Sequence, residues 1–275
     1  MDLARLANAR KARIADLYRD VIAAGRLERL AELAASAYTP HVPAFRGIEP
    51  LEPGLDALEA RLRRVGRIPN RVARIIVDGD WSFAHVQWEG AVPVAGVDIF
   101  RFDAHDRIAA HWNVRQPLSG TRAQVDERFS STVTSDAGPS PEPDRLTARV
   151  REMLTELWSK GNADLVADFY AESYVQHNAD MPGGYARIRE IVENDIPRYI
   201  EATGGPFPVD VHHIGAEGDI VFVHLSLFMA GINRNDGDRS TNVDIFRVDR
   251  HGRMVEHWDV LQIEGVALPP TTTAF

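Results

Sequence analysis

The chain has 275 residues, of which 44% are hydrophobic and 26% charged, and its formal net charge is −9. This composition is typical of a soluble globular protein, and the length allows one large domain or two of ordinary size. The absence of cysteine excludes disulfides, thiolate nucleophiles and thiolate metal ligands, and the acidic balance argues against a nucleic-acid partner, because phosphate binding needs a basic face.

The N-terminal stretch, residues 1–20, carries charges throughout and has no apolar core, so it does not resemble a secretory signal. No apolar run in the sequence approaches the roughly 20 residues that a membrane-spanning helix needs. We therefore expect a cytoplasmic protein that has no membrane partner.

Each half of the sequence predicts helices followed by strands. In the second half, Leu146, Val150 and Leu157 recur at helical spacing in an opening helix that ends at Gly161. Two further helices are expected at 163–170 and 185–202, followed by strands at 209–216, 220–230, 241–248 and 254–263. The first half repeats this order between residues 2 and 116. Helices segregated from a curved, mostly antiparallel sheet define an α+β fold, and its concave face is a natural ligand pocket.

The two halves are copies of one another. Four blocks match in the same order, and the last two share a constant offset of 146 residues without a gap. The matching blocks are 38–41 with 174–177, 80–85 with 219–224, 97–103 with 243–249, and 111–116 with 257–262. Four ordered matches indicate a tandem duplication.

The segment between the copies, 121–143, is rich in Ser, Thr, Pro and Gly and has no apolar periodicity. Such a composition predicts a flexible linker. The expected organisation is therefore a first domain at 1–120, a linker at 121–143 and a second domain at 144–275.

The last hairpin of the second copy brings two carboxylates together. Side chains alternate between faces along a strand, so His257 and Asp259 share a face. If the turn centres on residues 251 and 252, Asp244 lies opposite Asp259 and Phe246 opposite His257. Directly opposed Cβ atoms are about 4.5–5.5 Å apart. Two carboxylates this close do not both ionise readily, so one should act as an acid and the other as a base.

The same register in the first copy places Asp98 opposite Asn113, which leaves one titratable group fewer. Simpler roles stay open for several of these residues. Asp244 and Asp98 could bond backbone groups or an arginine at the sheet edge. His257 and His111 could be core histidines or could orient a ligand.

The Glu-His-Trp-Asp-Val run at 256–260, together with the preceding strand and turn, resembles the SnoaL-like polyketide cyclases of the NTF2-like superfamily. The segment from Tyr174 through His177 and Asn178 to the glycines that follow resembles the helix-to-pocket segment of that group. The resemblance implies two cone-shaped domains, each with three N-terminal helices packed on a curved mixed sheet. It also implies catalysis without metal or organic cofactor, with Asp259 as general base.

The first copy departs from the family pattern. Asn113, Ala110 and Val42 stand where the second copy has Asp259, Glu256 and Asn178. We therefore expect the second domain to carry the chemistry. Back-to-back association of sheets in this superfamily further implies a pseudo-dimer of the two domains within the chain, and a homodimer is possible.

The function expected from these observations is a cofactor-free cyclase or isomerase that acts on a small polyketide-like substrate. An epoxide hydrolase or epoxide-opening cyclase is the first alternative, and a non-catalytic binding or interaction module the second. The predicted catalytic residues are Asp259, Asp244, His257 and His177. The predicted substrate-binding residues are His41, Asp98, His111, Asn113, Asn178, Phe246 and Tyr174. No metal site is expected, because the histidine and carboxylate spacings lack the usual ligand patterns.

Overall fold

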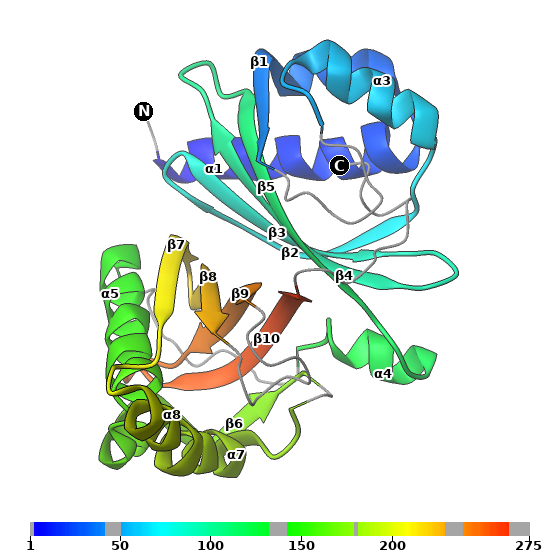
Figure 1. Cartoon of the computed structure of the whole chain (residues 1–275). Helices are drawn as coiled ribbons and strands as arrows, with labels where there is room; N and C mark the ends of the chain where they lie inside the picture. The colour runs from blue at the N-terminus through cyan, green and yellow to red at the C-terminus, as the bar shows by residue number, and fades with distance from the viewer. Residues whose placement is uncertain (1–2, 42–50, 132–141, 179–180, 229–238, 264–275) are drawn as a thin grey trace. The chain divides into compact units, whose positions relative to one another are not determined.

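The computed structural model describes residues 3–41, 51–131, 142–178, 181–228 and 239–263. The chain divides into two compact units, one that ends at Thr121 and one that runs from Arg122 to Ile263 (Figure 1). Each unit contains one five-stranded sheet and a set of helices. The α+β fold expected from the sequence is confirmed in both copies. No described helix is long and apolar enough to cross a membrane.

The first unit opens with helix α1 (Leu3–Asp16), which continues as a π-helical stretch (Leu17–Ala23). Next come a 3₁₀ turn (Leu27–Arg29), α2 (Leu30–Leu33), strand β1 (Ala34–His41) and α3 (Leu55–Val65). Strands β2 (Asn70–Asp78), β3 (Trp81–Trp88), β4 (Val94–Phe102) and β5 (Ile108–Pro117) complete it. The sheet order is β1-β5-β4-β3-β2, and only the β1–β5 pair is parallel.

The second unit starts with α4 (Arg122–Glu127), α5 (Pro143–Met153) and a π-helical stretch (Leu154–Ser159). After a 3₁₀ turn (Ala163–Leu165) follow α6 (Val166–Phe169), β6 (Tyr170–Gln176), α7 (Gly184–Glu190), a second π-helical stretch (Ile191–Asp195) and α8 (Ile196–Thr203). Strands β7 (Val209–Glu217), β8 (Ile220–Phe228), β9 (Arg239–Val248) and β10 (Met254–Ile263) follow. The order β6-β10-β9-β8-β7 repeats that of the first sheet.

The apolar spacing explains why the opening helix of the second unit forms where the sequence predicts it. Leu146, Val150 and Met153 are buried on one face of α5, which packs on β7 and β8. Gly161 follows the helix with φ of +73°, a left-handed conformation that ends helices and that glycine adopts without steric cost.

The register predicted from the turns is confirmed in both copies. Asp244 pairs with Asp259 and Phe246 with His257 in the β9–β10 ladder. Asp98 pairs with Asn113 in the β4–β5 ladder. Since the side-chain period of a strand is two, these pairs place the aspartates and the histidine on one face of the sheet.

Two features differ from the sequence-based expectation. No strand is predicted directly after the helix expected at 163–170, whereas residues 170–176 form β6, which pairs in parallel with β10. The segment expected to be a linker carries α4, which belongs to the second unit, and residues just after α4 contact the sheet of that unit: Trp258 Nε1 donates to the Ser130 carbonyl oxygen at 2.7 Å. Val42, compared above with Asn178, and residues 264–275 lie outside the described residues.

Candidate functional site

A cavity opens in the second unit between the concave face of the sheet and the helices. Its walls are mainly apolar and include Leu154, Trp158, Met181, Phe207, Leu227 and Leu261. Its polar groups converge from β9, β10 and the end of β6. They are Asn178, Asn242, Asp244, His257 and Asp259. An apolar cavity with a few convergent polar groups is the usual form of a small-molecule site.

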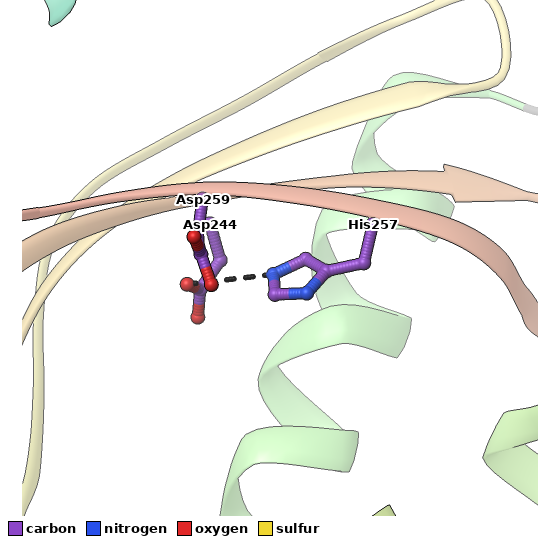
Figure 2. A group of neighbouring side chains, drawn as sticks. All are labelled: Asp244, His257 and Asp259. Atoms are coloured by element: carbon purple, nitrogen blue, oxygen red, sulfur yellow. Dashed lines mark ion pairs between the residues drawn. The ribbon is translucent and has the colours of Figure 1, made fainter. Parts of the chain in front are cut away.

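The carboxylates of Asp244 and Asp259 lie side by side on neighbouring strands, with His257 next to them (Figure 2). Asp244 Oδ1 accepts a hydrogen bond from Asn242 Nδ2 at 2.9 Å and lies 3.5 Å from His257 Nε2. Asp259 Oδ2 accepts from Asn178 Nδ2 at 2.9 Å. The other oxygen, Asp259 Oδ1, is buried and has no hydrogen-bond partner in the described part of the chain.

Burial raises the pKa of Asp259 above its usual range, because water no longer solvates the charged form. The neighbouring Asp244 charge raises the pKa of Asp259 further, whereas His257, Asn178 and Arg128 oppose the rise. A carboxyl group with a raised pKa can both give and take a proton closer to neutral pH.

His257 stacks on Phe246, with ring centroids 4.6 Å apart and an interplanar angle of 13°. Both residues line the cavity, as does Tyr174 from β6. The structure thus brings together six of the residues that the sequence singled out: Asp259, Asp244, His257, Asn178, Phe246 and Tyr174.

His177, predicted from the sequence as a catalytic residue, does not line this cavity. Its ring stacks on Trp258, which faces away from the cavity, and its Nε2 lies 2.8 Å from Glu256 Oε1. Its Nδ1 lies 3.0 Å from the backbone oxygen of Glu127. His177 therefore helps to fasten the end of α4 to the outer face of the sheet. It directly follows β6, which places it beside Glu256 and Trp258.

The corresponding site of the first unit is organised differently. Asp98 is fully buried, and its carboxylate receives Tyr18 Oη at 2.5 Å, His111 Nε2 at 2.8 Å and an Arg115 Nη at 2.5 Å. Burial acts to raise the pKa of Asp98, but the Arg115 charge and the hydrogen bonds outweigh it and lower that pKa. Burial lowers the pKa of His111. Asp98 is thus held in its charged form, and the positive charge of Arg115 balances it.

Large side chains fill the space that is open in the second unit. Arg115 occupies the register position of Leu261, and Trp88 occupies that of Leu227. Tyr18 corresponds to Leu154, because each lies seven residues before the glycine that follows the opening helix of its unit. All three are buried, and the Arg115 guanidinium lies over the Trp88 ring, 5.0 Å from its centroid.

Gly96 shows how tightly this space is filled, since it occupies the position of Asn242. A Cβ atom at Gly96 would lie 2.6 Å from Trp88 Nε1 and 2.8 Å from an Arg115 Nη. Such distances leave no room for a side chain.

Four first-unit residues that the sequence singled out for substrate binding do not face an open cavity. Asp98, His111 and Asn113 are buried within the sheet face that Tyr18, Trp88 and Arg115 cover, instead of facing an open cavity. His41 is exposed and stacks on Trp112, on the other face of β5.

Sequence reasoning missed Asn242 and the three leucines that leave the cavity open. Asn242 could have been found, since it lies two residues before Asp244 and therefore on the same face. A leucine has no polar or titratable group that would mark it as a site residue. The role of these leucines becomes visible only when they are compared with the larger Tyr18, Trp88 and Arg115 at the same positions of the first unit.

Asp244, His257 and Asp259 also form a possible cation site. Each offers one ligand atom, and these atoms lie within 4.8 Å of one another. Two carboxylates and one imidazole are a donor set that suits several divalent metals. Whether His257 can serve as a ligand depends on which ring nitrogen carries the proton.

A family model described as a SnoaL-like domain matches the sequence twice, over residues 14–134 and 150–257. The chain therefore belongs to the SnoaL-like family and contains two copies of its domain. No curated protein matches this sequence.

Solved structures of similar fold each correspond to part of the chain. An NTF2-like protein from Burkholderia xenovorans LB400 is 15% identical, with a TM-score of 0.36, and covers 46% of this chain and 95% of its own. A protein described as a SnoaL-like polyketide cyclase from Jannaschia sp. CCS1 is 14% identical, with a TM-score of 0.35 and coverages of 40% and 88%. A steroid Δ-isomerase from Pseudomonas aeruginosa is 22% identical, with a TM-score of 0.33 and coverages of 40% and 82%.

Proposed function

We propose that the second unit is a cofactor-independent acid–base enzyme that acts on a small, largely apolar organic molecule. The observation that carries this proposal is Asp259. Its Oδ1 is buried without a partner beside an apolar cavity, and its pKa is raised. A polar atom buried without a partner costs free energy, and a substrate that supplies the partner would recover that cost.

In the proposed reaction, Asp259 Oδ1 accepts a proton from a carbon next to a carbonyl group, or from a hydroxyl. Asn178 holds the other oxygen and so fixes the direction of attack. The proton then returns to a different atom of the same molecule, so no external reagent is consumed. Negative charge that develops on the substrate oxygen is stabilised by hydrogen-bond donors in the cavity. Isomerisation needs no more than these steps. In a cyclisation, the carbanion first attacks a second carbonyl carbon of the same molecule, the π bond of that carbonyl breaks as the ring bond forms, and the proton returns to the resulting alkoxide oxygen.

The test compares two strains of the producing organism, one with the wild-type protein and one with the Asp259→Asn variant. The small-molecule metabolites of the two strains are measured by mass spectrometry. General acid–base catalysis contributes about 10²–10⁴-fold, so we expect product to fall by that order and substrate to accumulate. A substrate of the same mass as the product would support cyclisation or isomerisation. A substrate lighter by one water would instead indicate hydrolytic epoxide opening.

Asp164→Asn is the matched control. Asp164 is an exposed aspartate of the same unit, outside the cavity, so its substitution should leave metabolites unchanged. If Asp259→Asn also changes no metabolite while the protein stays folded, the proposed reaction is wrong, and a non-catalytic binding module becomes the better account.

A further inference from the structure

A chain of hydrogen bonds behind the cavity determines the orientation of the Gln176 amide. The backbone N–H of Asn178 donates to Gln176 Oε1 at 2.9 Å. An amide N–H needs an acceptor, so the oxygen of the Gln176 side chain must face Asn178 and its NH₂ group must face the other way. That NH₂ group lies 2.8 Å from His257 Nδ1.

This orientation determines where His257 carries its proton. The NH₂ group of Gln176 can only donate, so His257 Nδ1 has to be the acceptor and has no hydrogen. A neutral imidazole has one N–H, which must then be at Nε2. Nε2 is buried, has no hydrogen-bond partner among the described residues, and lies toward the two carboxylates, 3.5 Å from Asp244 Oδ1 (Figure 2).

We propose that Gln176 is a positioning residue that holds His257 as the neutral Nε2–H tautomer, so that His257 donates a hydrogen bond in the cavity and does not act as the base. This inference rests on the proposed function for its catalytic meaning, although the tautomer itself does not.

The groups around His257 explain what the donor would do. Asp244 faces it from β9 and Asp259 from β10, while Tyr174 on β6 lies with its ring centroid 6.3 Å away. Asp244 already accepts a hydrogen bond from Asn242. The Nε2–H of His257, 3.5 Å from Asp244 Oδ1 and without a hydrogen-bond partner among the described residues, is therefore the group that can donate to a substrate oxygen, while Asp259 Oδ1 exchanges the proton.

The first unit reaches the same tautomer with a different donor. Pro40 occupies the position of Gln176, and each pairs in parallel with the histidine of the neighbouring strand. Pro40 has no side-chain donor, and Tyr38 Oη instead lies 3.0 Å from His111 Nδ1. His111 Nε2 lies 2.8 Å from Asp98. In both units, therefore, a donor contacts Nδ1 and a carboxylate lies on the Nε2 side.

The tautomer also bears on the possible cation site. A ring nitrogen that carries a hydrogen has no lone pair in the ring plane to offer a metal. While Gln176 donates to Nδ1, His257 Nε2 is a donor and not a ligand. Of the three groups, only the two carboxylates then remain as ligands.

Long-range ¹H–¹⁵N correlation spectra of the ¹⁵N-labelled full chain test the proposal without a substrate. The chain has ten histidines, and loss of one signal set in His257→Gln assigns His257. At pH 7 we expect a protonated Nε2 and an unprotonated Nδ1 in the wild type. In Gln176→Glu the new carboxylate can only accept, so the proton should appear on Nδ1, and Gln176→Met, which has no donor, should show a mixture of tautomers.

Tyr38→Phe is the matched control, because it removes the equivalent donor in the first unit. It should change the His111 signals and leave those of His257 unaltered. A wild-type His257 that is protonated at Nδ1, alone or at both nitrogens, would overturn the proposal, as would an unchanged tautomer in Gln176→Glu.

Activity provides a separate readout once the reaction is known. We expect turnover in Gln176→Glu to fall by about 10²-fold or more, since a wrong histidine tautomer removes a positioned donor. If the spectra agree with the proposal but Asp259→Asn changes no metabolite, the positioning role stands and the proposed enzyme function fails.

Discussion

The two units share one fold and one strand register, yet the aspartate on the inner face of β4 in the first unit and the aspartate on β10 in the second have pKa values shifted in opposite directions. In the first unit, Asp98 is paired with Arg115 and sealed by Tyr18, and its pKa is lowered. In the second unit, Asp259 faces a cavity with one oxygen unpartnered, and its pKa is raised. The strand position shared by Asp98 and Asp244 delivers a carboxylate to the same face of the sheet in both copies, and only the second unit adds another carboxylate, Asp259, opposite it. Whether a carboxylate on this face stabilises the fold or is available for chemistry depends on what lies over it.

The difference also shows which residues separate the filled face of the first unit from the cavity of the second. Arg115, at the position of Leu261, occupies space beside Trp88 and also contacts the Asp98 carboxylate. One strand position thus contributes to both the volume and the electrostatics of this face.

Removal of Arg115 should have the largest effect on stability. Arg115→Leu leaves the Asp98 charge buried without its cation, and breaking a buried pair in this way costs about 3–5 kcal/mol. Chemical denaturation at pH 7 measures the loss. Because the pKa of Asp98 is lowered in the folded protein, its stabilising contribution is present above the unfolded pKa and lost as pH falls. The cost of the substitution should therefore shrink in acid. A change of less than about 1 kcal/mol at pH 7 would contradict the role given to Arg115.

The reverse substitution should close the second cavity. Leu261→Arg places a cation on the face that carries Asp244 and Asp259, in the position that Arg115 takes in the first unit. We expect the affinity for a small aromatic probe such as 2-naphthol, followed by its fluorescence, to fall at least tenfold, about 1.4 kcal/mol.

Leu3→Arg adds the same charge at a leucine that is 79% exposed and should leave probe binding unchanged. Equal binding by the wild type and Leu261→Arg would show that the probe does not use this cavity.

Asp259→Asn should produce the smallest effect, a gain in stability. The raised pKa means that the folded state holds a proton that the unfolded state has released, so stability falls as pH rises from the unfolded pKa through the folded one. The amide variant lacks that titration and should be more stable than the wild type at pH 7, by about 0.5–2 kcal/mol, with the difference vanishing near pH 3.

Asn113→Asp makes the mirror change in the first unit, where it adds a second carboxylate opposite Asp98. It should lower stability at pH 7. A wild type that gains stability over Asp259→Asn as pH rises would contradict the raised pKa.

Local pattern was sufficient to predict much of the fold. The repeat, the helices of the second unit and the strands after them follow from apolar spacing and turn residues. The pairing of Asp244 with Asp259 follows from strand period and turn position, because both are set by neighbouring residues. Fewer site residues were predictable. Asp244, His257 and Asp259 were predicted because they share one hairpin, whereas Asn178 and Tyr174 were predicted as site residues from the family resemblance.

The sequence by itself determined the duplication, because four blocks of residues match in the same order in the two halves. It also determined the α+β class and the face on which the aspartates lie, since these depend on residue spacing within one helix or hairpin. Tertiary structure alone decided that His177 faces away from the cavity, that Tyr18 and Arg115 converge on Asp98, and that Gln176 contacts His257. These contacts join residues that are far apart in the chain or on strands paired in parallel. Their geometry depends on how helices and strands pack together, and local residue patterns do not predict that packing.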